Sequence, residues 1–67
     1  MELLDVVVLT QDIENKKLKK GSLGTIIEQL SEDVFMVEFV DTKGVTYATS
    51  ILSSVKLMKV YYEPIEA

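Results

Sequence analysis

The sequence VFMVEFV, at residues 34–40, is the strongest indication of the fold in this chain. Its side chains alternate with a period of two, which is typical of a β-strand. The alternation places Phe35, Val37 and Phe39 on one face. The opposite face includes Glu38, whose carboxylate would be costly to bury without a partner. We therefore expect the face of Phe35, Val37 and Phe39 to point into the core.

Four flanking segments predict further strands. Residues 23–30 precede the central stretch across the polar linker SED, and residues 45–49 follow it across DTKG, whose glycine suits a positive φ. The β-branched run at residues 5–9 predicts a first strand. After two serines, the short alternation at residues 55–57 predicts a single 3₁₀ turn and a fifth strand. Five short strands predict an all-β fold, a small partly open barrel, because closure removes exposed sheet edges.

The connection over residues 11–22 is the longest between the predicted strands. Ile13 and Leu18 are apolar enough to pack beneath it. Against two acids, it carries four lysines: Lys16, Lys17, Lys19 and Lys20. These lysines are candidates for contact with an anion or an acidic partner. The alternative is an exposed loop whose charges maintain solubility.

The chain has 67 residues, which is room for one core and no second domain. We expect residues 1–60 to form the barrel and residues 61–67 to form a C-terminal tail, packed on the barrel or at an interface. Tyr61 and Tyr62 give the tail two adjacent aromatic side chains. They are candidate partner-binding residues, although one of them could instead cover the open end of the barrel.

The chain has few of the residue types that commonly act in catalysis. The chain has no histidine and no cysteine, which excludes Ser–His and Cys–His nucleophile pairs and the common zinc sites. The nearest carboxylate cluster, Glu32 and Asp33 with Asp41, falls on predicted turns, where acidic residues are routine. We therefore expect no enzyme, no metal site and no cofactor.

The charge balance argues against nucleic acid as the partner. Seven lysines face eleven acidic residues, giving a net charge of −4, so the molecule should repel a phosphate backbone. No apolar run approaches the ~20 residues that a membrane helix needs. The absence of cysteine and of a basic, apolar export signal at the N-terminus predicts a cytoplasmic location.

Three motifs, taken in order, carry a resemblance to a known family. They are DVVVL at residues 5–9, GSLGTIIE at 21–28 and VEFVDTKGVTYA at 37–48, followed by Leu52 and Leu57. The chain resembles a family of small bacterial proteins of unknown function with an SH3-like barrel, over roughly residues 3–60. The resemblance implies that fold and supplies no activity or binding residue. The family pattern stops soon after Val60, so the Tyr61 and Tyr62 tail departs from it.

A looser similarity connects Gly21 and Gly24, followed by an apolar strand, with the KOW segment of ribosomal and transcription-elongation proteins. Glycines at this spacing also occur wherever a loop turns sharply into a strand, which is a purely structural need. KOW segments that bind RNA tend to be basic, and this chain departs from that.

Three functions follow as hypotheses. The leading one is a protein-binding module, an inhibitor or antitoxin-like partner of a neighbouring gene product, because an acidic body suits a basic surface. The second is nucleic-acid binding of the KOW type through the loop lysines. The third is a structural role through self-assembly, driven by the tail or by an unpaired strand edge.

Overall fold

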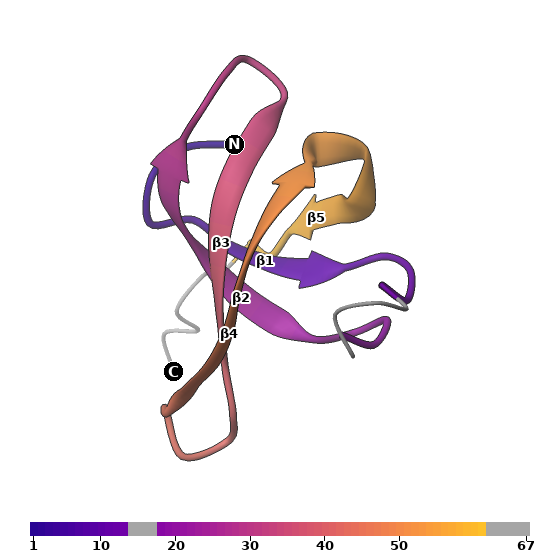
Figure 1. Ribbon diagram of the computed structural model, residues 1–67, viewed down its shortest axis with the longest axis vertical. Coiled ribbons are helices and arrows are strands. Elements are labelled where there is room, and N and C mark those ends of the chain that lie inside the picture. The colour runs from indigo at the N-terminus through magenta and orange to yellow at the C-terminus, as the bar shows by residue number, and fades with distance from the viewer. Residues whose placement is uncertain (14–17, 62–67) are drawn as a thin grey trace, which may run out of the picture.

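The computed structural model describes residues 1–13 and 18–61 and shows an all-β chain (Figure 1). Its elements are β1 (Val6–Leu9), β2 (Leu23–Gln29), β3 (Val34–Val40), β4 (Thr46–Ser53), the 3₁₀ turn η2 (Ser54–Lys56) and β5 (Leu57–Lys59). All five strands form one antiparallel sheet in the order β4-β3-β2-β1-β5. The predicted fold class, five strands with one 3₁₀ turn, is confirmed.

The sheet is curled but not closed. Strands β4 and β5 end the strand order, and they do not pair with each other. Figure 1 shows β1 and β2 crossing the long β3–β4 hairpin at a steep angle. Such crossing follows from the right-handed twist that accumulates between neighbouring strands. The curl turns one face of the sheet inward, where apolar side chains from distant parts of the chain meet.

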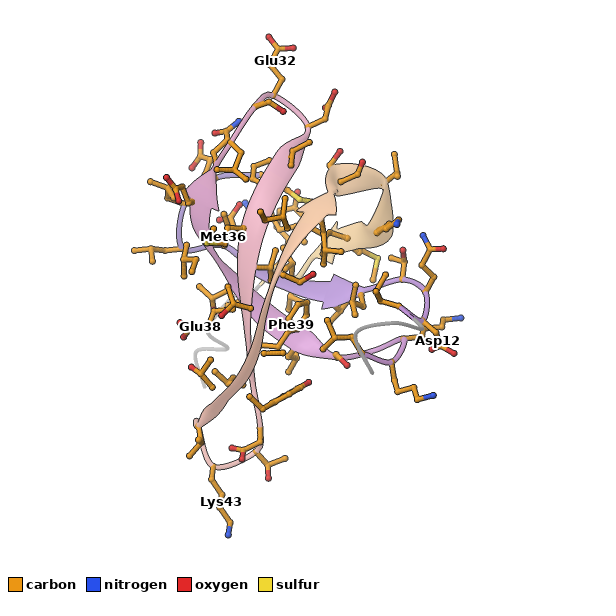
Figure 2. All side chains as sticks on the ribbon, in the orientation of Figure 1. Asp12, Glu32, Met36, Glu38, Phe39 and Lys43 are labelled. Atoms are coloured by element: carbon orange, nitrogen blue, oxygen red, sulfur yellow. The ribbon has the colours of Figure 1, made fainter. Side chains whose placement is uncertain are left out.

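Alternation along β3 builds the centre of the core, as the sequence predicts. Phe35, Val37 and Phe39 are at most 2% exposed, whereas Glu38 is half-buried on the opposite face. Figure 2 shows Glu38 and Phe39 on opposite sides of β3. The buried apolar residues of the described chain are Val7, Leu9, Leu18, Ile26, Phe35, Val37, Phe39, Leu52 and Leu57. Every strand contributes to this core.

Strand β4 is longer than the sequence predicts. The expected strand at residues 45–49 begins at Thr46 and continues to Ser53, and β5 begins at Leu57. The sequence does not reveal this continuation, because Ser50 is a polar residue on the core face, where an apolar residue is expected; its side chain is only 4% exposed. The strand ends where the Ser53 hydroxyl accepts a hydrogen bond from the Val55 backbone, at 3.4 Å, and begins η2.

Two β-bulges interrupt the regular pairing. The register of β2 on β3 shifts between Ile26 and Glu28, which leaves Ile27 without an opposite residue. The register of β3 on β4 shifts after the Phe39–Ala48 pair, and this shift leaves Tyr47 without an opposite residue. A bulge redirects the side chain of the extra residue and increases the local twist. Ile27 and Tyr47 are both exposed as a result.

The connection between β1 and β2 packs on the core through its apolar residues. Leu18 is 1% exposed and Ile13 is half-buried, as predicted. The two residues form an isolated antiparallel bridge, with N–H to O distances of 2.8 and 3.3 Å. Asp12 accepts a further bond from the backbone N–H of Lys20, at 2.8 Å. The described ends of this connection are therefore ordered by backbone contacts.

Gly24 allows β2 to lie against β3. A Cβ atom at this position would be 2.5 Å from Val37 Cγ1 and 3.0 Å from the Phe39 ring. Gly21, three residues earlier, has a φ of +91°, which most side chains disfavour. The glycine spacing that resembles a KOW segment therefore has a structural cause in this sheet.

Over residues 1–13 and 18–61, the structure contains no helix with the length and apolar character needed to cross a membrane.

Candidate binding surface

The structure describes three of the residues that the sequence predicts as partner contacts, namely Lys19, Lys20 and Tyr61. Lys19 and Lys20 are exposed in the connection that leaves β1 at its C-terminal end. Tyr61, 80% exposed, follows β5, whose antiparallel pairing carries the chain toward the N-terminal end of β1. The described members of the two groups therefore lie toward opposite ends of β1. The remaining predicted residues, Lys16, Lys17 and Tyr62, lie outside the described residues.

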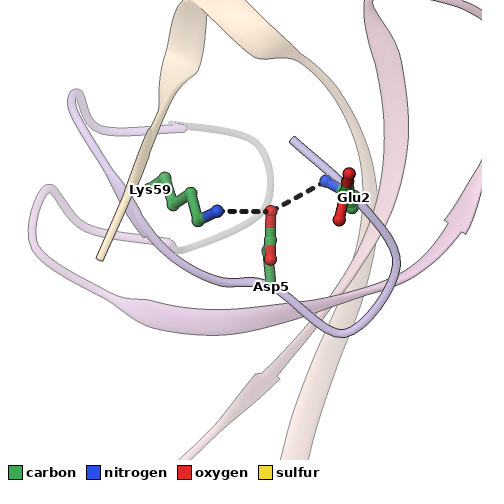
Figure 3. A network of polar contacts seen from close by, with 3 residues as sticks. All are labelled: Glu2, Asp5 and Lys59. Atoms are coloured by element: carbon green, nitrogen blue, oxygen red, sulfur yellow. Dashed lines mark hydrogen bonds and ion pairs between the residues drawn. The ribbon is translucent and has the colours of Figure 1, made fainter. Parts of the chain in front are cut away.

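Figure 3 shows a small polar network of Glu2, Asp5 and Lys59 that joins the N-terminal turn to β5, and Tyr61 lies beside its lysine. Lys59 Nζ is 5.0 Å from the centroid of the Tyr61 ring and 3.5 Å from Asp5 Oδ2. The backbone N–H of Glu2 donates to the same carboxylate oxygen, at 2.8 Å. The N–H of Glu2 and then the Lys59 ammonium lower the pKa of Asp5, although desolvation opposes them. This network fixes the chain ends of the described fold.

The carboxylates that the sequence places on turns are far apart. Glu32 and Asp33 lie in the turn before β3, and Asp41 lies in the turn after it. The strand of seven residues between them spans about 23 Å, at about 3.3 Å per residue. Within the described part of the chain, no three acidic side chains gather in a way that could hold a metal ion.

Apolar side chains also cover part of the sheet face that points away from the core. Alternation places Val8 of β1, Leu23 of β2 and Val40 of β3 on this face. Val8 is opposite Leu23 in one pairing and opposite Met58 of β5 in the other. Leu23 and Met58 are 49% and 58% exposed. We call Met58, Val8, Leu23 and Val40 the outer apolar row.

The outer apolar row ends in an open groove of about 470 Å³. Leu23 and Val40 contribute to its lining, and the bulged Tyr47, 52% exposed, lines it from β4. The residues that line the groove are Gly21, Ser22, Leu23, Val40, Asp41, Thr42 and Tyr47. The groove therefore lies between the start of β2 and the β3–β4 turn.

Asp41 makes one wall of the groove rigid. Its Oδ1 accepts hydrogen bonds from the backbone N–H groups of Lys43 and Val45, at 2.8 and 3.0 Å. The Asp41 carbonyl also accepts a bond from the N–H of Gly44, whose φ is +79°, as the sequence predicts for this turn. These three bonds fix the turn, and the carboxylate adds a negative charge to the groove wall.

Together these features define a small antiparallel all-β module with an apolar outer row and a groove. A family model, the domain of unknown function DUF4926, matches residues 3–59. The chain belongs to this family, as the match covers most of its length. The comparison with curated proteins gave no match, and the comparison with solved structures gave none.

Sequence reasoning missed the groove. One signal was available, because Val40 is an apolar residue at an outward position of β3, although the inward positions of that strand are already apolar. Tyr47 gives no such signal, because its position depends on a bulge that the sequence does not reveal. Tyr47 and Asp41 line the same groove.

Proposed function

We propose that this protein is a non-catalytic protein-binding module that holds an apolar side chain of its partner in the groove. The observation that carries the proposal is the outer apolar row and its continuation into a groove of about 470 Å³. Large apolar side chains exposed together, beside a hollow that can accept an anchor residue, are typical of protein interfaces. Leu23 and Tyr47 are the residues that we expect to contact the anchor.

Charge indicates the kind of partner. The molecule has a net charge of −4, and Asp41 places a carboxylate on the groove wall. Glu38 adds a second carboxylate on the outer face of β3. A basic surface around an apolar anchor complements this arrangement and would associate faster because of it. An inhibitor or antitoxin-like role against a basic neighbouring gene product is the finer form of this proposal.

The test is an affinity capture from a lysate of the native cell, with three forms of the full chain as bait. Wild type is expected to retain one dominant protein in near-equal amount. Leu23→Ser, in the groove, is expected to lose it, whereas Val55→Ser is expected to keep it. Val55 is a suitable control because it is 78% exposed and lies outside the groove, in η2.

Two results would contradict the proposal. One is recovery of the bait alone by the wild-type chain. The other is equal retention of the partner by Leu23→Ser and Val55→Ser, because a substitution in the groove would not weaken a partner that binds elsewhere. The same capture distinguishes the nucleic-acid alternative, since RNA binding predicts retained RNA at about 50 mM salt that is lost steeply as salt rises.

A further inference from the structure

Strand β4 leaves a long unprotected edge on the sheet. It is the outermost strand beside β3, and no described segment pairs with its other side. Its eight residues, TYATSILS, include no charged residue, no proline and no glycine. The opposite edge is β5, which has only three residues and includes Lys59. Short strands and lysines protect edges from pairing, so β5 is protected and β4 is not.

The ladder shows which backbone groups of β4 are free. Ser54 donates its N–H to the carbonyl of Asp33, at 2.7 Å, which continues the β3–β4 register by one pair. In an antiparallel ladder, hydrogen-bonded pairs alternate with non-hydrogen-bonded pairs. The alternation therefore directs the N–H and C=O groups of Thr49, Ile51 and Ser53 away from β3. Thr49 and Ile51 present both of their backbone groups to a new strand, and Ser53 presents its N–H, because its carbonyl accepts the first hydrogen bond of η2.

The free edge is complementary to itself. A two-fold axis at Ile51 sets Ile51 opposite its own copy, and Thr49 opposite Ser53 of the second copy, so that all three free positions pair. Ile51 is 57% exposed, and its cross-strand neighbour on β3 is Met36. The axis would thus join two Met36–Ile51 pairs into one apolar row. Aliphatic and hydroxyl pairs of this kind stabilise neighbouring strands.

Space for this contact exists on the same part of the sheet. A hollow of about 250 Å³ is lined by Met36, Thr49, Ser50 and Ile51. It can receive side chains from a strand added beside β4. Pairing over residues 49–53 uses none of the residues that line the groove, although Tyr47 of the groove lies on β4 two residues before Thr49.

We infer that two copies of this chain pair through the free edge of β4, in antiparallel register about Ile51, to form a continuous ten-stranded sheet. A second copy fits this edge better than a charged peptide because the edge offers no charge to select one. Two molecules of net charge −4 also place no like charges opposite each other in this register. A closed, isologous dimer results.

The test is the mass of the full chain by sedimentation equilibrium over a wide range of concentration. Wild type is expected to approach twice the 7.5 kDa mass of the chain as concentration rises. Thr49→Pro removes one outward N–H without touching the bonds to β3, so it is expected to weaken the dimer about tenfold or more. Ile51→Lys places a charge at the axis and should do the same.

The matched control is Leu3→Lys, which introduces the same charge at a position of similar exposure in the N-terminal turn, outside β4 and η2, and should leave the dimer intact. A monomeric wild type at every concentration would overturn the inference, and so would a dimer that survives both edge variants. If both variants fail to fold, amide exchange of the wild type decides. The amides of Thr49, Ile51 and Ser53 must then gain protection as concentration rises, and unchanged rapid exchange would overturn the inference.

Discussion

At the scale of single residues, the described chain has one residue other than glycine with a positive φ. Leu4 has a φ of +69° and is 75% exposed. It occupies the third position of a turn that closes with a bond from the Asp5 N–H to the Glu2 carbonyl, at 3.1 Å. Glycine is favoured at such a position, and a left-handed conformation costs other residues about 1–2 kcal/mol. The N-terminal turn is therefore strained.

This strain predicts a stabilising substitution. Leu4→Gly should relieve the strain and raise the unfolding free energy by up to about 1 kcal/mol, after the greater chain entropy of glycine is subtracted. Leu3→Gly is the control, because Leu3 has an ordinary φ and the change should cost about 0.5–1 kcal/mol. Urea denaturation measures both. Equal losses from the two variants would show that Leu4 is not strained.

The second residue-scale prediction concerns pH. The pKa of Asp5 is lowered in the fold by the Glu2 N–H and by Lys59. The stability that this carboxylate contributes is therefore complete above its unfolded pKa of about 3.9 and is lost as the pH falls through the lower folded value. Asp5→Asn should reduce stability at neutral pH, and its difference from wild type should vanish below that window. Urea midpoints measured across the acid range test this, and a difference independent of pH would refute it.

Gly24 gives the third prediction. Its close approach to Val37 and the Phe39 ring leaves no room for a Cβ atom, and the branched side chain of Val37 has little freedom to move. Gly24→Ala should cost about 1–3 kcal/mol through overpacking. Thermal or urea unfolding would measure it. A neutral or stabilising Gly24→Ala would mean that β2 and β3 are not in such close contact.

At the scale of the elements, the success of sequence reasoning depended on uninterrupted alternation. The bounds of β3 were predicted correctly because its inward positions are all apolar and no bulge falls within its own residues. Strand β4 was predicted too short, because Ser50 places a hydroxyl on the core face and Tyr47 is displaced by a bulge. Period-two reasoning assumes one residue per rung of the ladder, and a bulge breaks that assumption.

The groove was less predictable than the strands for a related reason. It is built from the start of β2, the end of β3 and the bulged position of β4, which are far apart in the sequence. Local patterns report which face a residue occupies, and they do not report which residues from other strands lie beside it. The lysines of the β1–β2 connection and the tyrosines of the tail were predicted as partner contacts because the composition of both segments is unusual. Of these residues, the structure describes only Lys19, Lys20 and Tyr61.

At the scale of the whole molecule, the two faces of the sheet have different roles. In the described part of the chain, the inward face buries eight apolar residues beneath Leu18 of the β1–β2 connection, and this core supplies the stability that a chain of 67 residues requires. The outward face retains exposed apolar residues at Leu23 and Met58, beside the groove. Exposed apolar side chains add little to the stability of a monomer, so their presence is consistent with recognition of a partner.

The most direct test of this division compares one substitution on the two faces of the same strand. Val37 is fully buried, whereas Val40 is half-buried and lines the groove. We expect Val37→Ala to lower the unfolding free energy by about 2 kcal/mol and Val40→Ala to lower it by less than half of that. Equal losses from the two variants in urea denaturation would contradict the account.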